Sequence, residues 1–158
     1  MNRLRIERTI KRIAYQIAEK VKGKKICLVG LNERGYAVAS EINQILSETH
    51  QSKLASLYIE NAESDAEKIK SQVDFRDTIL FLVDDVIFTG KTMFSALQHL
   101  LDQPDYPVYI TVLIDRGNRH LPVKAEFTGM EIPTKPNEHV EMTLENGVAE
   151  EVFLYRYI

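Results

Sequence analysis

The sequence predicts an α/β fold in which a central, mainly parallel sheet is flanked by helices. Short continuous apolar runs, typical of buried strands, recur through the middle of the chain and alternate with segments whose apolar residues have helical spacing. This alternation suits a parallel sheet, because parallel strands are joined by crossover connections that are usually helices. With 158 residues the chain has the length of one domain, and we expect a single domain over residues 1–158.

The chain is expected to open with an amphipathic helix and a buried strand. Apolar side chains recur at helical spacing over residues 4–21, and Gly23 follows as a helix-ending residue. The apolar run at 26–29 then predicts a strand. It contains the only cysteine, Cys27, which we interpret as a core thiol and not as a nucleophile, because burial raises the pKa of a thiol.

Two further pairs of strand and helix are predicted. A helix is expected at 35–46 and a strand at 53–60, whereas residues 61–78 are strongly polar and are interpreted as a surface loop with room for a short helix. The apolar run at 79–83 predicts another strand, and helical spacing resumes at 93–101. The middle of the chain therefore alternates strand and helix.

The C-terminal part is expected to end in an antiparallel hairpin. Residues 107–114 form another predicted strand. Alternating apolar residues around Val140 and at 152–157 then flank Asn146-Gly147. This pair favours a tight turn, since both residues tolerate positive φ angles.

Composition and charge exclude several classes of protein. The longest apolar runs fall well short of the roughly 20 residues of a membrane helix, and the charged N-terminus does not resemble a signal peptide. We therefore expect a cytoplasmic protein without a membrane partner. The net charge of −3 argues against broad, nonspecific binding of nucleic acid.

The segment 80–92 has the pattern of a ligand site. A buried strand is followed by Asp84 and Asp85, then by a loop and the start of a helix. Ligands of parallel sheets bind beyond the carboxyl ends of the strands, where these acids are expected. The loop ends with Thr89, Gly90, Lys91 and Thr92, where free backbone N–H groups at a helix start favour a phosphate. The residues alone leave an alternative open, in which the acids cap the helix and Thr-Gly is a turn.

This segment resembles the phosphoribosyl pyrophosphate signature of type I phosphoribosyltransferases. The shared pattern is an apolar strand followed by Asp-Asp, three residues, Thr-Gly, one residue and Thr. The resemblance implies the type I phosphoribosyltransferase fold, with a small C-terminal antiparallel hood over the sheet. It also implies that Asp84 and Asp85 act on the ribose and with Mg²⁺, and that Phe88, Thr89, Gly90, Lys91 and Thr92 bind the 5′-phosphate.

A second match is the segment 29–35, which resembles the pyrophosphate loop of that family. The resemblance implies that Asn32, Glu33, Arg34 and Gly35 bind the diphosphate. Asn32-Glu33 departs from the lysine and threonine usual there, and Glu33 repels a diphosphate unless a metal intervenes.

A third match, residues 113–129 followed by Ile132-Pro133-Thr134, resembles the PyrR group, which are uracil phosphoribosyltransferases and pyrimidine-operon attenuation proteins. By position, the resemblance implies that Lys124 and Val140 contact the base, with a solvated surface lysine as the alternative for Lys124. It further implies a homodimer. RNA is a possible partner, with Arg12, Arg116 and Arg119 as phosphate contacts.

The resemblance predicts a phosphoribosyltransferase that transfers the phosphoribosyl group of phosphoribosyl pyrophosphate to a pyrimidine base, most simply uracil, giving UMP and pyrophosphate. One departure supports an alternative. The family carries a long flexible hairpin with Tyr-Arg-Asp-Asp before the acidic strand, whereas this chain has only residues 61–78 there, without that stretch. The alternative is a catalytically weak, PyrR-like regulatory protein that binds phosphoribosyl pyrophosphate or nucleotides, with or without RNA.

Overall fold

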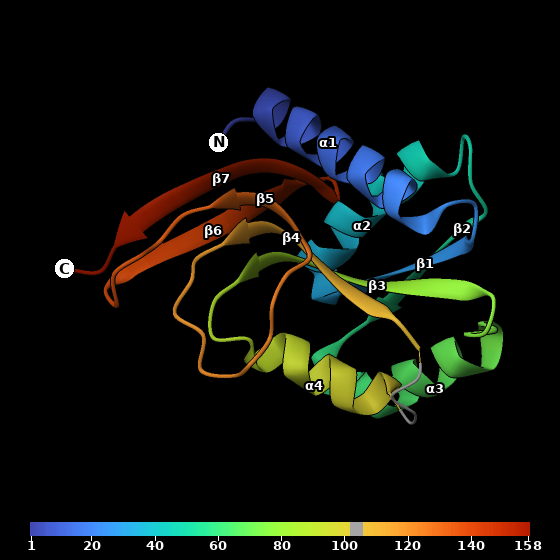
Figure 1. Cartoon of the computed structure of the whole chain (residues 1–158). Helices are drawn as coiled ribbons and strands as arrows, with labels where there is room; N and C mark the ends of the chain where they lie inside the picture. Colours follow the sequence, from blue (N-terminus) through green and yellow to red (C-terminus); the bar gives the residue numbers. More distant parts are fainter. Residues whose placement is uncertain (102–105) are drawn as a thin grey trace.

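The computed structural model describes residues 1–101 and 106–158 and has a five-stranded parallel sheet with a separate two-stranded antiparallel sheet (Figure 1). The strand order of the large sheet is β2-β1-β3-β4-β5. In chain order the elements are α1 (Arg3–Val21), β1 (Lys25–Leu31), α2 (Asn32–Leu46), β2 (Ser52–Leu57), the 3₁₀ turn η1 (Ile59–Asn61), α3 (Ala62–Gln72), β3 (Thr78–Ile87), α4 (Lys91–Leu100), β4 (Val108–Asp115), β5 (Phe127–Glu131), β6 (Glu138–Glu145) and β7 (Val148–Arg156). The predicted fold class is confirmed.

The sheet is buried on both faces, which explains why its strands appear in the sequence as continuous apolar runs. Alternate residues of β1 point to opposite faces, so Ile26 and Leu28 pack with α1 and α2, whereas Cys27 and Val29 pack with α3 and α4. Figure 1 shows these two helical layers on opposite sides of the sheet. Cys27 is fully buried, as predicted, and its burial raises the thiol pKa to about 11.

The segment predicted as a surface loop contains a packed helix. Residues 62–72 form α3, whose Ala62, Ala66 and Ile69 are buried against the sheet and α4. Two of these three side chains are alanines, so the helical stripe gives little hydrophobic signal in the sequence. The connection between β2 and β3 is therefore fixed to the α4 side of the sheet.

Two element boundaries also differ from the predictions. β3 extends to Ile87, so Asp84 and Asp85 lie within the last part of this strand and not beyond it. α2 begins at Asn32, three residues earlier than predicted, so residues 32–34 form its first turn. Both differences move candidate site residues from loops onto regular elements, which hold side chains more rigidly.

Residues 116–126, all of which the structure describes, join β4 to β5 without a helix, and α1 covers this part of the sheet instead. Gly129 in β5 makes this contact possible, because a Cβ atom there would lie 2.7 Å from Cγ2 of Thr9 and would overlap the carbonyl oxygen of Leu113. Arg12 reinforces the contact by donating to the carbonyl oxygen of Gly129 at 2.5 Å. The N-terminal helix is thereby fixed to the edge strand.

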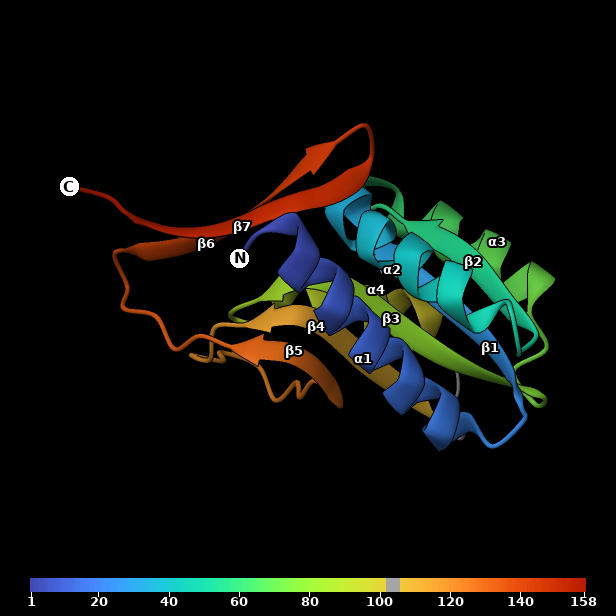
Figure 2. The same ribbon diagram turned by 90° about the horizontal axis from the view of Figure 1, so that it is seen from above.

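The C-terminal hairpin of β6 and β7 is the predicted antiparallel element, and it is called the hood below. Asn146 and Gly147 form its turn with φ angles of 52° and 77°. Its inner side chains Met142, Ala149 and Val152 join the core formed with α1 and α2. Figure 2 shows the hood beside the N-terminal ends of α1 and α2, at the carboxyl ends of the parallel strands.

Among residues 1–101 and 106–158, no helix has both the length and the apolar character needed to cross a membrane.

We predict that Gly129→Ala destabilises the protein by more than about 2 kcal/mol, because overpacking forces the backbone of β5 and β4 apart. Urea unfolding followed by circular dichroism measures this change. Adding Thr9→Ala removes only the side-chain contact and leaves the Leu113 carbonyl in place, so little stability should return. Full recovery in the double variant would show that the side chain of Thr9 alone restricts residue 129.

Candidate functional site

The candidate site lies where β1 and β3 end side by side. The chain leaves β1 through α2 on one face of the sheet, and it leaves β3 through α4 on the other face. The two connections diverge between these neighbouring strands, which is the usual position of ligand sites in open parallel sheets. A cavity of about 370 Å³ lies there, lined by Leu31, Asn32, Glu33, Arg34, Asp84, Asp85, Val86 and Thr92.

Close backbone packing brings the start of α2 against the end of β3. A Cβ atom on Gly35 would lie 2.6 Å from the carbonyl oxygen of Val83 and 3.2 Å from Oδ1 of Asp84. Asn32 adopts a left-handed conformation with φ of 54°, and its Oδ1 accepts a hydrogen bond from the Ile59 N–H at 3.0 Å. Residues 32–35 are thus placed beside the acids by glycine packing and by an asparagine anchor.

The acidic pair is partly buried. Asp84 is only 9% exposed, and its Oδ1 accepts the backbone N–H of Asp85 at 2.9 Å. Desolvation raises the pKa of Asp84 well above its ordinary value, and the neighbouring charge of Asp85 raises it further. The surroundings therefore disfavour the ionised form of Asp84. Carboxyl groups in such surroundings are typical of functional sites.

The loop before α4 forms a second, smaller cavity next to the first. It measures about 120 Å³ and is lined by Asp84 and residues 86–93. Gly90 has a φ of 88°, which favours glycine, and its carbonyl oxygen accepts the first helical bond from the Phe94 N–H at 2.9 Å. The backbone N–H of Lys91 faces Thr89 Oγ1 at 3.4 Å, a long and weak contact. The arrangement suits a small anion at the helix start.

This loop is held from behind by the segment that follows β4. Arg119 donates to the carbonyl oxygen of Phe88 at 2.8 Å and to Oδ2 of Asp115 at 2.7 Å. The N–H groups of His120 and Leu121 both donate to the carbonyl oxygen of Thr89, at 3.0 and 3.2 Å. The loop is therefore held by contacts within the protein.

Arg116 does not occupy the position expected of an RNA contact. It is only 5% exposed, and its guanidinium lies over the Phe88 ring, with Cζ 3.9 Å from the ring centroid. The expectation that Arg116 contacts RNA phosphates is therefore wrong, because the segment after β4 turns its side chain inward. Sequence reasoning found this arginine but missed its internal role, since a basic residue in a loop usually faces solvent.

The remaining candidates come from α2, from the hood and from the connection between β4 and β5. Arg34 lines the larger cavity and donates to Oε1 of Glu141 in the hood at 2.9 Å, an ion pair that the sequence did not indicate. Val140 precedes Glu141 in β6, and its side chain packs against the core. Lys124 is exposed on the connection from β4 to β5 and does not line either cavity.

The larger cavity suits Mg²⁺ held jointly with a phosphorylated ligand. Mg²⁺ in such sites takes one or two carboxylates together with substrate phosphates and water. Asp84 and Asp85 would supply the carboxylates here, and a cation beside them would offset the desolvation that raises the pKa of Asp84. Among the described residues no cluster of three or more His, Cys, Asp or Glu side chains could hold a metal unaided.

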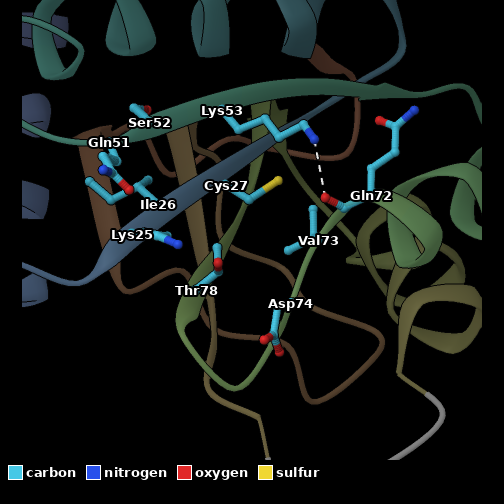
Figure 3. Close-up of a pocket in the computed structure, with 10 residues that line it drawn as sticks. All are labelled: Lys25, Ile26, Cys27, Gln51, Ser52, Lys53, Gln72, Val73, Asp74 and Thr78. Carbon is cyan, nitrogen blue, oxygen red and sulfur yellow. Dashed lines mark hydrogen bonds between the residues drawn. The ribbon is translucent and has the colours of Figure 1, made fainter.

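Another cavity lies at the opposite end of the sheet, near the amino ends of β1, β2 and β3 (Figure 3). It measures about 410 Å³ and is lined by Lys25, Cys27, Lys53, Val73 and neighbouring residues. Lys25 pairs with Asp77 at 3.1 Å, and Lys53 donates to the carbonyl oxygen of Gln72 at 3.1 Å. Its lysines are thus partnered within the fold, and none of the predicted site residues lies there.

The phosphoribosyl transferase domain family matches residues 2–146 of the chain. The chain is 35% identical to the Bifunctional protein PyrR of Clostridium acetobutylicum, over 92% of this chain and 89% of that protein. It is 37% identical to the protein of the same name from Clostridium kluyveri, over 88% and 85% respectively. The likeness therefore extends over nearly the whole length of both chains.

Two solved structures that share this fold are distant in sequence. The hypoxanthine-guanine phosphoribosyltransferase of Leishmania tarentolae, in complex with GMP, superposes with a TM-score of 0.69 at 16% identity, covering 84% of this chain and 80% of that chain. The hypoxanthine phosphoribosyltransferase of Trypanosoma cruzi has a TM-score of 0.67 at 15% identity, covering 89% and 82%. At identities this low, the likeness shows only that the fold is shared.

We predict that Asp84→Asn stabilises the protein at neutral pH. The pKa of Asp84 is higher in the folded than in the unfolded state, so the carboxylate form costs folding free energy. This cost is absent at pH below the unfolded pKa. The penalty grows as the pH rises from the unfolded toward the folded pKa. Melting curves from pH 3 to 8 should therefore show a higher midpoint for the variant than for the native protein at pH 7. Between pH 4 and 7 the variant should also lose less stability than the native protein. A lower midpoint at pH 7 would show that the Asp84 carboxylate stabilises the fold. Capping of α4 by the acids is already excluded, because both lie within β3 and no side chain caps α4 at Gly90.

Proposed function

Because the chain belongs to the phosphoribosyl transferase family, we propose that it transfers the phosphoribosyl group of phosphoribosyl pyrophosphate to a pyrimidine base, most simply uracil. The observation that supports this proposal most is the junction of the two cavities at the ends of β1 and β3. Asp84, Val86 and Thr92 line both of them, so one ligand can extend from the helix start of α4 across the acids to residues 32–35.

Each part of this surface suits one part of phosphoribosyl pyrophosphate. The small cavity at residues 88–92 takes the 5′-phosphate through the N–H groups at the start of α4. Asp84 and Asp85 accept hydrogen bonds from the ribose hydroxyls. Arg34 and the first turn of α2 then face the diphosphate, with Mg²⁺ offsetting the negative charge of Glu33.

The reaction breaks the bond between the anomeric carbon and the diphosphate oxygen, whose electron pair leaves with pyrophosphate. A ring nitrogen of the base forms the new bond to the anomeric carbon and loses its proton to solvent water. Positive charge develops on the ribose between these events, and the carboxylates of Asp84 and Asp85 stabilise it in a partly desolvated cavity. Bound Mg²⁺ would supply charge neutralisation for the departing diphosphate.

The base is proposed to lie between the hood and the segment after β4. Val140 offers backbone groups from β6, and Lys124 offers an ammonium group that pairs with an exocyclic oxygen of a pyrimidine. The support for both is positional, from the resemblance to the PyrR group. The exposed Lys124 must move toward the base or act at its outer edge.

A second candidate function is a regulatory protein that binds the same ligands with little turnover. The supporting observation is α3, which packs against α4 where the family has a flexible hairpin. Without a cover from this segment, water can compete with the base at the cationic anomeric carbon. RNA is a further partner for this candidate, since α1 exposes Arg5, Arg8, Lys11 and Arg12 beside Tyr15.

We predict that purified protein with Mg²⁺ and phosphoribosyl pyrophosphate releases pyrophosphate with uracil faster than with hypoxanthine, guanine or orotate. A coupled pyrophosphate assay measures the rates, and titration calorimetry measures binding of phosphoribosyl pyrophosphate in the same buffer. Binding without release from any base would favour the regulatory candidate. Absence of both would remove the phosphoribosyl site altogether.

If RNA is a partner, its affinity is expected to fall steeply with salt, because each neutralised phosphate releases a counterion. Filter binding between 50 and 200 mM KCl gives the slope. Arg8→Gln and Lys11→Gln should each make that slope less negative by roughly 1 while leaving the pyrophosphate assay unchanged. Flat binding, or none at low salt, would exclude this role.

A further inference from the structure

The loop that is proposed to bind the 5′-phosphate touches the segment leading into the hood through one buried side chain, Arg116. Its guanidinium stacks on Phe88, with Cζ 3.9 Å from the ring centroid. At the same time its Nε donates to Oγ1 of Thr134 at 3.0 Å, and its Nη2 donates to the carbonyl oxygen of Glu138 at 2.5 Å. Glu138 is the first residue of β6. One planar group therefore joins the loop before α4 to the start of the hood.

Loss of any of these contacts of Arg116 costs free energy, because the guanidinium is buried. Arg116 is 5% exposed, and desolvation lowers its pKa even though Glu138 acts in the opposite direction. A buried guanidinium needs its ring face and its donors satisfied, because water cannot replace them. A displacement of the hood therefore breaks contacts of Arg116 or carries the group along, and either change alters the support under the Phe88 ring.

Arg116 is absent from the residues that line the two site cavities, so it does not contact a ligand there directly. Phe88 lines the smaller cavity and precedes the two residues, Thr89 and Gly90, that shape the turn into α4. The side chain of Arg116 supports this turn from the side facing the hood. Arg119 also contacts Phe88, by donating a hydrogen bond to the carbonyl oxygen of that residue.

We propose that Arg116 is a positioning residue that makes the affinity of the loop at 88–92 for a sugar 5′-phosphate depend on the placement of the hood. The proposal rests on the proposed function, because it takes this loop as the 5′-phosphate site. The hood is proposed to contact the base, so the linkage couples occupation of the base position to the grip on the phosphate.

The test uses ribose 5-phosphate and Mg²⁺-pyrophosphate, which separate the two halves of the site. Arg116→Met keeps the length of the side chain and removes the guanidinium. We expect it to weaken the binding of ribose 5-phosphate, measured by calorimetry, roughly tenfold. A loss of this size corresponds to one desolvated stacking contact or one charged hydrogen bond. Mg²⁺-pyrophosphate affinity should stay within about twofold, because residues 32–35 meet the hood through the partly exposed ion pair of Arg34 with Glu141, and exposed ion pairs contribute little. Equal losses for both ligands would indicate a merely structural role and overturn the proposal.

A double-mutant cycle tests the connection to the hood. Thr134→Val removes the hydroxyl that accepts from Arg116 Nε, at a residue outside both site cavities. It should weaken the binding of ribose 5-phosphate about threefold in the native protein and should have no effect on that binding in the Arg116→Met variant. Additive losses would show that Thr134 acts independently of Arg116, and unchanged affinity in both single variants would overturn the proposal.

Arg3→Met is the matched control, because Arg3 also joins the hood to the rest of the fold. Its Nη1 donates to the carbonyl oxygen of Ala149 in β7 and to Glu41 in α2, each at 2.8 Å, at the other end of the hood. Its removal should lower the melting temperature and leave ribose 5-phosphate affinity within about twofold. A loss as large as that of Arg116→Met would show that loosening the hood in general weakens the loop, and it would overturn the specific role of Arg116.

Two outcomes concern the protein itself. If Arg116→Met does not fold, Arg116→Lys replaces it, since lysine keeps the charge without a planar face for the ring, and the same selective loss is expected. If the native protein binds Mg²⁺-pyrophosphate but not ribose 5-phosphate, the loop at 88–92 is not the phosphate site. That result removes the proposed function and this inference together, whereas a failure of the variants alone removes only the inference.

Discussion

The parallel pairing of β1 with β3 is the constraint on which the site depends. Six residues of β1 are in register with β3, from Lys25 opposite Thr78 to Gly30 opposite Val83. This register places the start of α2 level with Asp84, and the missing side chain of Gly35 allows the two backbones to meet. Because the connections from β1 and β3 leave to opposite faces, the space between them is open. A shift of register would separate the acids from residues 32–35.

The electrostatics of the site oppose the stability of the fold without ligand. Burial and a like-charged neighbour raise the pKa of Asp84, which means that its carboxylate form costs folding free energy near neutral pH. A cation or a developing positive charge at this position relieves that cost. Such an arrangement is expected where binding or catalysis, and not folding alone, determines which residue is present.

The segment after β4 has a larger structural role than its irregular conformation suggests. Arg119, His120 and Leu121 hold the loop before α4, and Arg116 joins this loop to the hood. The hood in turn reaches the first turn of α2 through the ion pair of Glu141 with Arg34. Three segments that lie far apart in the chain are thereby connected around one site, with arginine side chains at each contact. Guanidinium groups suit this task because their donors point in several fixed directions.

The sequence by itself determined the fold class, the buried strands β1, β3 and β4, the hairpin turn at Asn146-Gly147 and the acidic segment before α4. These features follow from local patterns, since continuous apolar runs report burial on both faces and Asn-Gly reports positive φ angles. Only the tertiary structure decided that α3 is a packed helix, because its stripe consists mostly of alanines. It also decided that Arg116 points inward and that Arg34 meets Glu141, 107 residues away in the chain. Contacts of this kind depend on which strands become neighbours, and no local pattern in a single sequence records that choice.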